Sequence, residues 1–503
     1  MKHLGVLSLG LVLFLTARVG AEPASELVEE IWEVAHIDGA KVGYLHTTVR
    51  SKEIDGMRQL RANAELELTF KRNNAVMKLH MEQGTEETAE GKVTGVFMKQ
   101  ESGKGQALVL HGTVEGERLH VVVDNGRIDS KVRWSDQAVG LYQWLHLFEQ
   151  KKPKAGETFA FPGYEPIINH VVTMRVRVKE QEEVQLLGKK KSLLRVEMTP
   201  DKVEASGQVV QLPGVVWWLD GDFVPQRRQF EMEGLGTVLL TRTTREVATA
   251  AAPPAKLPDL GLKTLIALNR AIPKPYDSRA AVYRVTIRGD SEAATALASD
   301  AHQEVKNAKG ETFELHVHPV RHGEGRTSAD AAPAEYLASC PFINCDDKAV
   351  KDLARKIAGD ETDAWKKGVR LEKWVHANMR VDQSAPMVSA AQAARELTGD
   401  CRNHALLLAA LCRAEGVPSR IAVGLLYVDK AKQPQMGFHM WTEVYIDGQW
   451  LGLDAILGKG GVAASHIKIA DHSWRDVQSL TPFLPAARVL GKTAIEVVSV
   501  EGE

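Results

Sequence analysis

The feature that most restricts the fold is a period-two alternation of apolar and polar residues through the first half of the chain. It is clearest in residues 64–70, 76–81, 92–98, 119–123 and 171–178. Such alternation sends every second side chain to the same face of a strand. From Glu22 to Val247 we therefore predict a β-rich antiparallel domain, built as a meander, a sandwich or a strongly curved sheet, with one helix near Val139 to Gln150.

This β-rich domain carries no recognisable chemical motif, so its role stays open. Trp217 and Trp218 look like an exposed pair that would suit a ligand or a glycan. Two adjacent residues on a strand point to opposite faces, however, so one ring in the core and one on the surface is the alternative.

The first 21 residues have the composition of a secretory signal peptide. Lys2 precedes an apolar run from Leu4 to Leu15, and small residues occupy the cleavage position at Val19-Gly20-Ala21. The chain is therefore predicted to be exported, to the periplasm or the extracellular space. No later stretch reaches the roughly 18 apolar residues of a membrane-spanning helix, so no transmembrane segment is expected after cleavage. The formal net charge of −2 gives no basic footprint for nucleic acid.

A chain of 503 residues is expected to divide into two or three domains. An Ala/Pro-rich linker is predicted at 248–259, a small mixed β lead-in module at 260–340, and an α+β catalytic domain at 341–490. In the lead-in module we expect a short helix near Leu262 to Asn269 and strands at Ala281 to Ile287 and Thr312 to Val317. Oligomeric state is not predicted.

Two amphipathic helices are expected at the start of the 341–490 region. One runs from Lys348 to Ala358 and is capped by Asp347, and the other runs from Asp363 to Met379 and is capped by Thr362. Apolar residues at core spacing on the second helix include Trp374, which we assign to packing.

A cysteine lies at the start of a third helix. Asp400 is a good N-cap, leucines and alanines keep helical spacing from Cys401 to Glu415, and Gly416 suits the helix end. The free backbone N–H groups and the dipole of a helix N-terminus favour the thiolate form of such a cysteine. Cys401 is thus a candidate nucleophile.

A histidine and an aspartate follow on predicted strands at Ile421 to Val428, Phe438 to Ile446 and Gln449 to Ala455. Asp447-Gly448 is a two-residue hairpin signal that would pair residue 446 with 449. Trp441 would then face Asp454, and His439 would lie diagonally from Asp454 on the same face. Cys401, His439 and Asp454 together predict a catalytic triad of nucleophile, base and orienter.

These motifs resemble the transglutaminase-like superfamily. The matching residues are Gly399-Asp400-Cys401, His439-Met440-Trp441-Thr442-Glu443-Val444 and Trp450-Leu451-Gly452-Leu453-Asp454. The resemblance covers about Asp347 to Asp471 and implies a papain-like α+β domain with Cys401 as nucleophile, His439 as acid and base, and Asp454 as orienter. Asp400, Trp441 and Glu443 are supporting residues in this interpretation.

Cross-linking members of the superfamily have Gln before and Trp after the cysteine, where this chain has Asp400 and Arg402. The chain resembles the microbial Gly-Asp-Cys branch, for which an amide hydrolase or protease is our first hypothesis, with a peptide or protein as substrate. Protein-glutamine transamidation is the first alternative. An inactive domain that serves as a binding scaffold is the second. Gln383 is a candidate side-chain donor to the oxyanion, although a solvated loop glutamine is the simpler interpretation.

The remaining cysteines and histidines have structural alternatives. Cys340 and Cys345 either form a short-loop disulfide or stay free, and Cys412 is expected to be a buried apolar side chain. His316, His318 and His322 have the spacing of zinc ligands but also of a strand that ends in a polar turn. No metal or cofactor is predicted.

Overall fold

A computed structural model of the chain describes residues 25–54, 56–72, 74–101, 107–123, 128–166, 168–205, 208–232, 236–324, 331–428, 433–475 and 481–501. The predicted signal peptide lies outside the described residues. Within them, no helix combines the length and apolarity that crossing a membrane requires.

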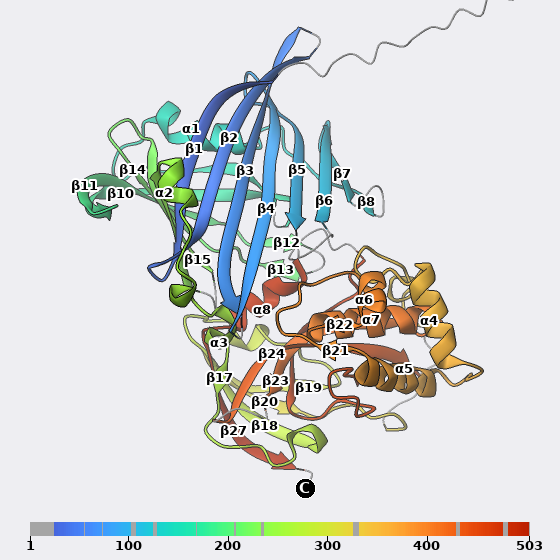
Figure 1. Ribbon diagram of the computed structural model, residues 1–503. Helices are drawn as coiled ribbons and strands as arrows, with labels where there is room; N and C mark the ends of the chain where they lie inside the picture. The colour runs from blue at the N-terminus through green and yellow to red at the C-terminus, as the bar shows by residue number, and fades with distance from the viewer. Residues whose placement is uncertain are drawn as a thin grey trace, which may run out of the picture.

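The first half of the described chain is one large antiparallel sheet, which Figure 1 shows as strongly curved. In spatial order it contains β8 (Ile128–Arg133), β7 (Arg118–Val123), β6 (Ala107–Glu115), β5 (Val93–Glu101), β4 (Ala75–Thr88), β3 (Met57–Arg72), β2 (Ala40–Ile54), β1 (Glu26–Ile37), β16 (Gly236–Thr243), β15 (Pro225–Met232), β14 (Val215–Leu219), β11 (Lys189–Pro200), β10 (His170–Leu186) and β9 (Thr158–Glu165). The predicted β-rich antiparallel structure is confirmed in its curved-sheet form. A short hairpin, β12 (Val203–Ala205) with β13 (Gln208–Val210), stands apart.

The helix predicted near Val139 to Gln150 is α1 (Leu141–Lys151), and it covers part of this sheet. Leu145 packs on strands β1 to β3, and Phe148 packs on the strands around Trp217. Neither sequence-based interpretation of the tryptophan pair holds, because both rings are buried: Trp217 is 4% and Trp218 5% exposed. Both faces of β14 are covered here: Trp217 contacts α1, and Trp218 packs with apolar residues of β10 and β11.

Short elements join the sheet to the second half of the chain. They are α2 (Arg245–Thr249), η2 (Pro254–Lys256), α3 (Leu260–Lys263), β17 (Ile266–Ala267) and η3 (Pro275–Asp277). The helix expected near Leu262 to Asn269 is only the single turn α3, capped by Asp259, and the chain then extends into β17.

The lead-in strands are β18 (Ala280–Ile287) and β20 (Thr312–Val317), as predicted, and they join a four-stranded sheet in the order β19-β20-β18-β27. β19 is Gln303–Lys309, and β27 is the final strand, Thr493–Glu501. β27 pairs with β18 over its whole length. The last strand of the chain thus completes a sheet that begins two hundred residues earlier. The intervening 3-10 helices are η4 (Ala293–Thr295) and η5 (Ala334–Tyr336).

The remaining helices and strands form the layers that hold the candidate site. α4 (Lys348–Ala358), α5 (Ala364–Asn378) and α6 (Ala390–Glu396) surround α7 (Cys401–Ala414). α7 also packs on a sheet in the order β17-β24-β23-β26, with β25 paired to β24. These strands are β23 (Ser419–Tyr427), β24 (Gln435–Ile446), β25 (Gln449–Leu453) and β26 (His466–His472). β21 (Arg380–Val381) pairs in parallel with β22 (Thr398–Gly399), and η6 (Thr481–Phe483) leads into α8 (Leu484–Val489).

Helix caps follow the predicted chemistry with one shift. Asp347 caps α4 by accepting from Ala349 N, as expected. Asp363 caps α5 by accepting from Lys366 N, so the predicted cap Thr362 was wrong by one residue. An aspartate at this position satisfies a free N–H group of the first turn and complements the helix dipole.

Candidate active site

Cys401 is the first residue of α7, where the sequence places it. The side chain of Asp400 accepts from Arg402 N at 2.9 Å and so caps the helix. Cys401 is 8% exposed, at the edge of an otherwise buried helix. Cys401 therefore lies in the first turn of a helix, where the helix dipole favours a negative charge.

The hairpin of β24 and β25 brings the histidine and the aspartate together. Ile446 pairs with Gln449 as predicted, and the register continues to Thr442 opposite Leu453. Asp454 is the next residue, and its Oδ2 lies 2.8 Å from His439 Nε2. Both side chains are buried. The predicted pairing is thus present as a direct hydrogen bond.

The second nitrogen of His439 is left to serve the thiol, and Cys401 is a hydrogen-bond partner of the His439 ring. Burial alone would lower the pKa of His439. The charge and hydrogen bond of Asp454, with the contact to Cys401, outweigh it and raise this pKa to about 10. The imidazolium form is therefore held at neutral pH beside the sulfur.

A second histidine, which sequence reasoning missed, binds the same carboxylate. His466 Nε2 lies 3.1 Å from Asp454 Oδ2. Burial lowers the pKa of His466, in contrast to that of His439. Burial would raise the pKa of Asp454, but His439 and His466 hold it below its ordinary value. A neutral His466 can donate Nε2–H to the carboxylate while Ala463 N donates to its Nδ1 at 3.3 Å.

The backbone at Asp454 is fixed by Glu372 of α5. Asp454 N donates to Glu372 Oε1 at 3.0 Å, and Gly460 N donates to Oε2 at 2.8 Å. Glu372 is completely buried, and burial raises its pKa to about 8. A signal was available in the sequence, because Glu372 lies four residues after Gly368 and three before Val375 on the buried stripe of the helix.

Trp441 and Glu443 lie on β24, the same strand as His439. The Trp441 ring is fully buried, stacks near His439 with ring centroids 6.3 Å apart, and meets His466 edge-on at 5.3 Å. Glu443 receives Arg420 at 2.7 Å and Lys468 Nζ at 2.9 Å. Trp441 thus contacts both histidines, and Glu443 is held by two cationic side chains; their role as supporting residues stays a prediction.

Asp400 joins the site to the N-terminal sheet. Arg402 Nε donates to Asp400 Oδ2 at 2.8 Å, and Arg72 Nη1 donates to the same oxygen at 2.7 Å. Arg72 is the last residue of β3, and in Figure 1 the β3–β4 hairpin reaches down to the C-terminal half. Burial would raise the pKa of Asp400, but the two guanidinium groups hold it below its ordinary value.

Gln383, the candidate oxyanion donor, is exposed in the turn after β21. Asp382 N in this turn donates to Gly399 O at 2.9 Å, so the turn lies beside the residues that precede Cys401. Asn403 secures the following loop by donating to Pro386 O at 2.8 Å and accepting from Val388 N at 3.1 Å.

Among the described residues, one group of three or more side chains could hold a metal ion: His439, Asp454 and His466, whose ligand atoms lie within 4.8 Å of one another. Its donors are engaged with one another through Asp454, and His439 also serves Cys401. The second set of histidines with zinc-like spacing does not form such a group; it consists of His316, His318 and His322. The His322 ring instead stacks on Trp365.

All four cysteines are free thiols, and all are buried. Cys340 and Cys345 therefore do not form the short-loop disulfide and are free, which was the other alternative. Cys412 is completely buried on α7, as predicted, and burial raises the pKa of its thiol.

Comparison with known families identifies the region that contains this site. Residues 351–455 match the model of the Transglutaminase-like superfamily, so this part of the chain is a transglutaminase-like domain. No curated protein matches the chain.

Three solved structures show partial similarity. A candidate cysteine protease from Cytophaga hutchinsonii is 18% identical, with 45% of this chain and 86% of that chain covered and a TM-score of 0.29. A β-barrel-like protein of a domain of unknown function from Brucella abortus is 10% identical, with coverages of 43% and 95% and a TM-score of 0.31. The periplasmic domain of TgpA from Pseudomonas aeruginosa, bound to ethylmercury, is 13% identical, with coverages of 36% and 91% and a TM-score of 0.23.

Proposed function

We propose that this chain is an exported thiol enzyme that hydrolyses peptide or protein amide bonds through a Cys401 acyl-enzyme. The observation that carries the proposal is the His439 imidazole, which is hydrogen-bonded to Asp454 at 2.8 Å and to the Cys401 thiol at the start of α7. A nucleophile, a base and an orienter in contact are the parts that covalent acyl transfer needs. Within the transglutaminase-like superfamily, the proposal assigns the chain to the Gly-Asp-Cys branch with a papain-like α+β domain.

The proposed reaction has two halves. In the first, the Cys401 sulfur attacks the amide carbon, the C–N bond breaks, and the His439 imidazolium gives its proton to the leaving amine. In the second, His439 takes a proton from water, the resulting oxygen attacks the thioester, and the carboxylic acid leaves as Cys401 regains its thiolate. The Cys401 backbone N–H is the proposed main-chain donor to the oxyanion, and Gln383 is the proposed side-chain donor.

The test is alkylation of the protein without its signal peptide by iodoacetamide across pH, with the modified cysteine identified by mass spectrometry. We expect rapid labelling at Cys401, a rate at neutral pH that falls by about 10²-fold or more in His439→Ala, and no labelling at that position in Cys401→Ala. Cys412→Ala is the matched control, because Cys412 lies on the same helix away from the site and its loss leaves the rate unchanged. Slow labelling that is indifferent to His439 would overturn the proposal in favour of an inactive scaffold.

Hydrolysis and transamidation are separated by a second assay with a protein substrate and a fluorescent primary amine. Hydrolysis releases fragments or ammonia without attaching the amine. Covalent incorporation of the amine into the substrate, lost in Cys401→Ala, would identify a transamidase instead.

A further inference from the structure

The N-terminal sheet encloses a large cavity that the proposed reaction does not use. Its volume is about 1430 Å³, which exceeds the roughly 300–1,000 Å³ of ordinary small-molecule sites. The cavity is partly open to solvent. Protein side chains are otherwise closely packed, so an apolar hollow of this size is a feature of the fold that a ligand could fill.

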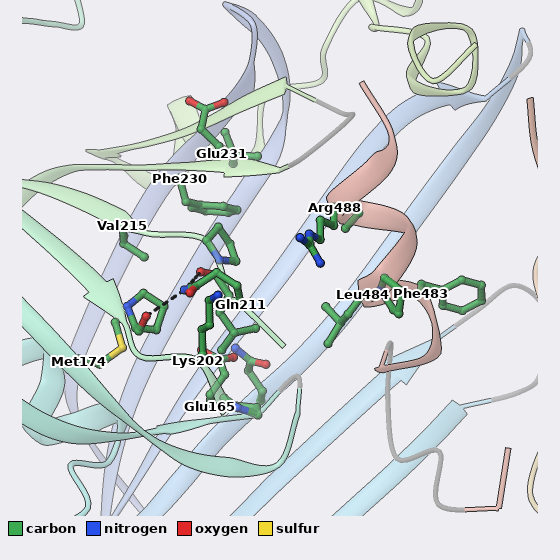
Figure 2. A pocket seen from close by; sticks show the side chains of 18 of the residues that line it. Glu165, Met174, Lys202, Gln211, Val215, Phe230, Glu231, Phe483, Leu484 and Arg488 are labelled. Carbon is green, nitrogen blue, oxygen red and sulfur yellow. Dashed lines mark hydrogen bonds between the residues drawn. The ribbon is translucent and has the colours of Figure 1, made fainter. Parts of the chain in front are cut away.

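The wall of the cavity is the apolar face that the period-two pattern creates. Leu66 of β3 lies directly opposite Met81 of β4, and Leu68 lies opposite Leu79. Across the sheet, Phe230 of β15 continues the same lining. Figure 2 shows Phe230 and Val215 on their strands and Leu484 and Arg488 of α8 on the other side. A helix of the C-terminal half thus bounds the cavity on that side.

The lining has the shape of a long slot. Along β4 it extends from Leu79 to Thr85, which at about 3.3 Å per residue is roughly 20 Å. α1 lies at one end of the slot and α8 at the other. The acyl chains of one bilayer leaflet span about 15 Å, half of a hydrocarbon core about 30 Å thick. A long acyl chain therefore fits along the slot.

The chemistry of the wall excludes an extended peptide. A peptide brings an N–H and a C=O with every residue, and each one buried without a partner is costly. The exposed surface of the wall is mostly apolar, although polar and charged side chains also line it, and an acyl chain has no hydrogen-bonding groups to satisfy. Ionic groups gather near α8, where Arg488 pairs with Asp290 and Lys202 pairs with Glu292. A polar head placed there would reach water and these side chains.

Two buried polar atoms in the lining lack the partners that a closely packed interior would supply. Gln83 Oε1 and Trp144 Nε1 are buried and have no hydrogen-bond partner. A buried polar atom without a partner costs free energy. Trp144 belongs to α1, so protein atoms do not pack fully at this end of the slot, and the proposed head of the acyl chain lies at the other end, near α8.

We propose that this cavity binds the long acyl chain of a fatty acid or a phospholipid, with the chain along β3 and β4 and the head toward α8. The site is separate from the Cys401 centre, so its occupation does not depend on the proposed hydrolysis. The source of the acyl chain, free acid or phospholipid, is decided by experiment.

The test uses cis-parinaric acid, a fatty acid that becomes fluorescent in apolar surroundings, with the full chain without its signal peptide. We expect saturable binding by the wild type. In the double variant Leu66→Gln and Leu79→Gln, we expect binding about tenfold or more weaker, because two amides then face the chain. The matched control is Met57→Gln with Val76→Gln on the same two strands, at side chains 65% and 52% exposed, and it should bind as the wild type does.

Competition identifies the source of the chain. Displacement of the probe by palmitate alone assigns a free fatty acid, and displacement by phosphatidylglycerol assigns a phospholipid. The proposal is overturned by any of three results: no saturable binding, equal binding by the cavity and control variants, or displacement by an apolar peptide but by neither lipid. Protection of the completely buried Cys412 from iodoacetamide in both double variants verifies that each one has folded.

Discussion

At the scale of single residues, the main property of the site is that one carboxylate accepts hydrogen bonds from two histidines whose pKa values are shifted in opposite directions. Asp454 Oδ2 accepts from His439 and from His466, yet the pKa of His439 is raised and that of His466 is lowered. The difference follows from position. His439 also faces Cys401, whose negative charge stabilises an imidazolium, whereas His466 is completely buried. One histidine is thereby set up to carry a proton and the other to hold the orienting group.

This arrangement predicts the alkaline side of the pH profile. The leaving amine needs a proton from the His439 imidazolium, so kcat/KM should fall as pH rises through about 10, the pKa of His439. In Asp454→Asn the charge that raises this pKa is absent. The fall should then move to lower pH, toward the ordinary histidine value of about 6.5, and activity at neutral pH should drop by about 10²-fold or more.

The matched control for that measurement is Asp471→Asn. Asp471 pairs with Arg420 at 2.8 Å and with Lys468 at 2.9 Å rather than with His439, so the alkaline limb should stay in place. If Asp471→Asn shifts the limb as far as Asp454→Asn does, the limb does not report the His439–Asp454 pair.

At the scale of elements, the β3–β4 hairpin connects the two halves of the molecule by hydrogen bonds and an ion pair. Lys71 N donates to Pro258 O at 2.8 Å, and Asn74 N donates to Asp259 Oδ2 at 2.6 Å. Arg72, between them, reaches Asp400. The tip of this one hairpin therefore binds both the connecting segment at Pro258 and Asp259 and the residue before Cys401.

The ion pair of Arg72 with Asp400 predicts an effect of Arg72 on the reactivity of Cys401. In Arg72→Ala, Asp400 keeps Arg402 but loses one of its two positive partners, so the negative potential at the start of α7 increases. A more negative surrounding disfavours the thiolate, and alkylation of Cys401 at neutral pH should slow by roughly three- to tenfold. Arg72→Lys should restore part of the rate.

Arg58→Ala is the control, because Arg58 is an exposed arginine at the other end of the same strand. Its rate should equal that of the wild type. An unchanged rate in Arg72→Ala, measured on a folded protein, would mean that Arg402 alone neutralises Asp400.

The elements also show what a sequence can and cannot reveal. Local patterns predicted α7, the β24–β25 register and the contact of His439 with Asp454, because a helix cap and a two-residue turn act over a few residues. His466 was missed because it comes to Asp454 from β26, across a long loop. Arg72 was missed because 328 residues separate it from Asp400, and no local rule connects strand tips to helix caps.

The same limit applies to the sheets. Alternation identified the strands of the N-terminal half but not whether the sheet would close as a sandwich or curve. Curvature depends on which strands become neighbours, and the β1–β16 pair joins residues some two hundred positions apart. The pairing of β27 with β18 is equally non-local.

At the scale of the whole molecule, the cavity is built from both halves and should couple their stabilities. Its wall takes Leu66 and Leu79 from the N-terminal sheet and Ile469 and Leu484 from the C-terminal half. A ligand that contacts both halves favours the state in which they are docked and folded. Binding to the native state alone stabilises it by about 2.7 kcal/mol at a ligand concentration of 100 Kd.

Cys412 offers a probe of this coupling that lies far along the chain from the β3–β4 wall. It is completely buried on α7, so it reacts with a thiol reagent only when the C-terminal half opens. In a Cys401→Ala background, saturating palmitate should slow the labelling of Cys412 and raise the midpoint of thermal unfolding. The Leu66→Gln and Leu79→Gln variant should show neither effect. A contrary result would be that palmitate protects the N-terminal sheet from hydrogen exchange while Cys412 is labelled at its original rate. The two halves would then open independently. The Arg72–Asp400 ion pair and the shared cavity wall would not make them one cooperative unit.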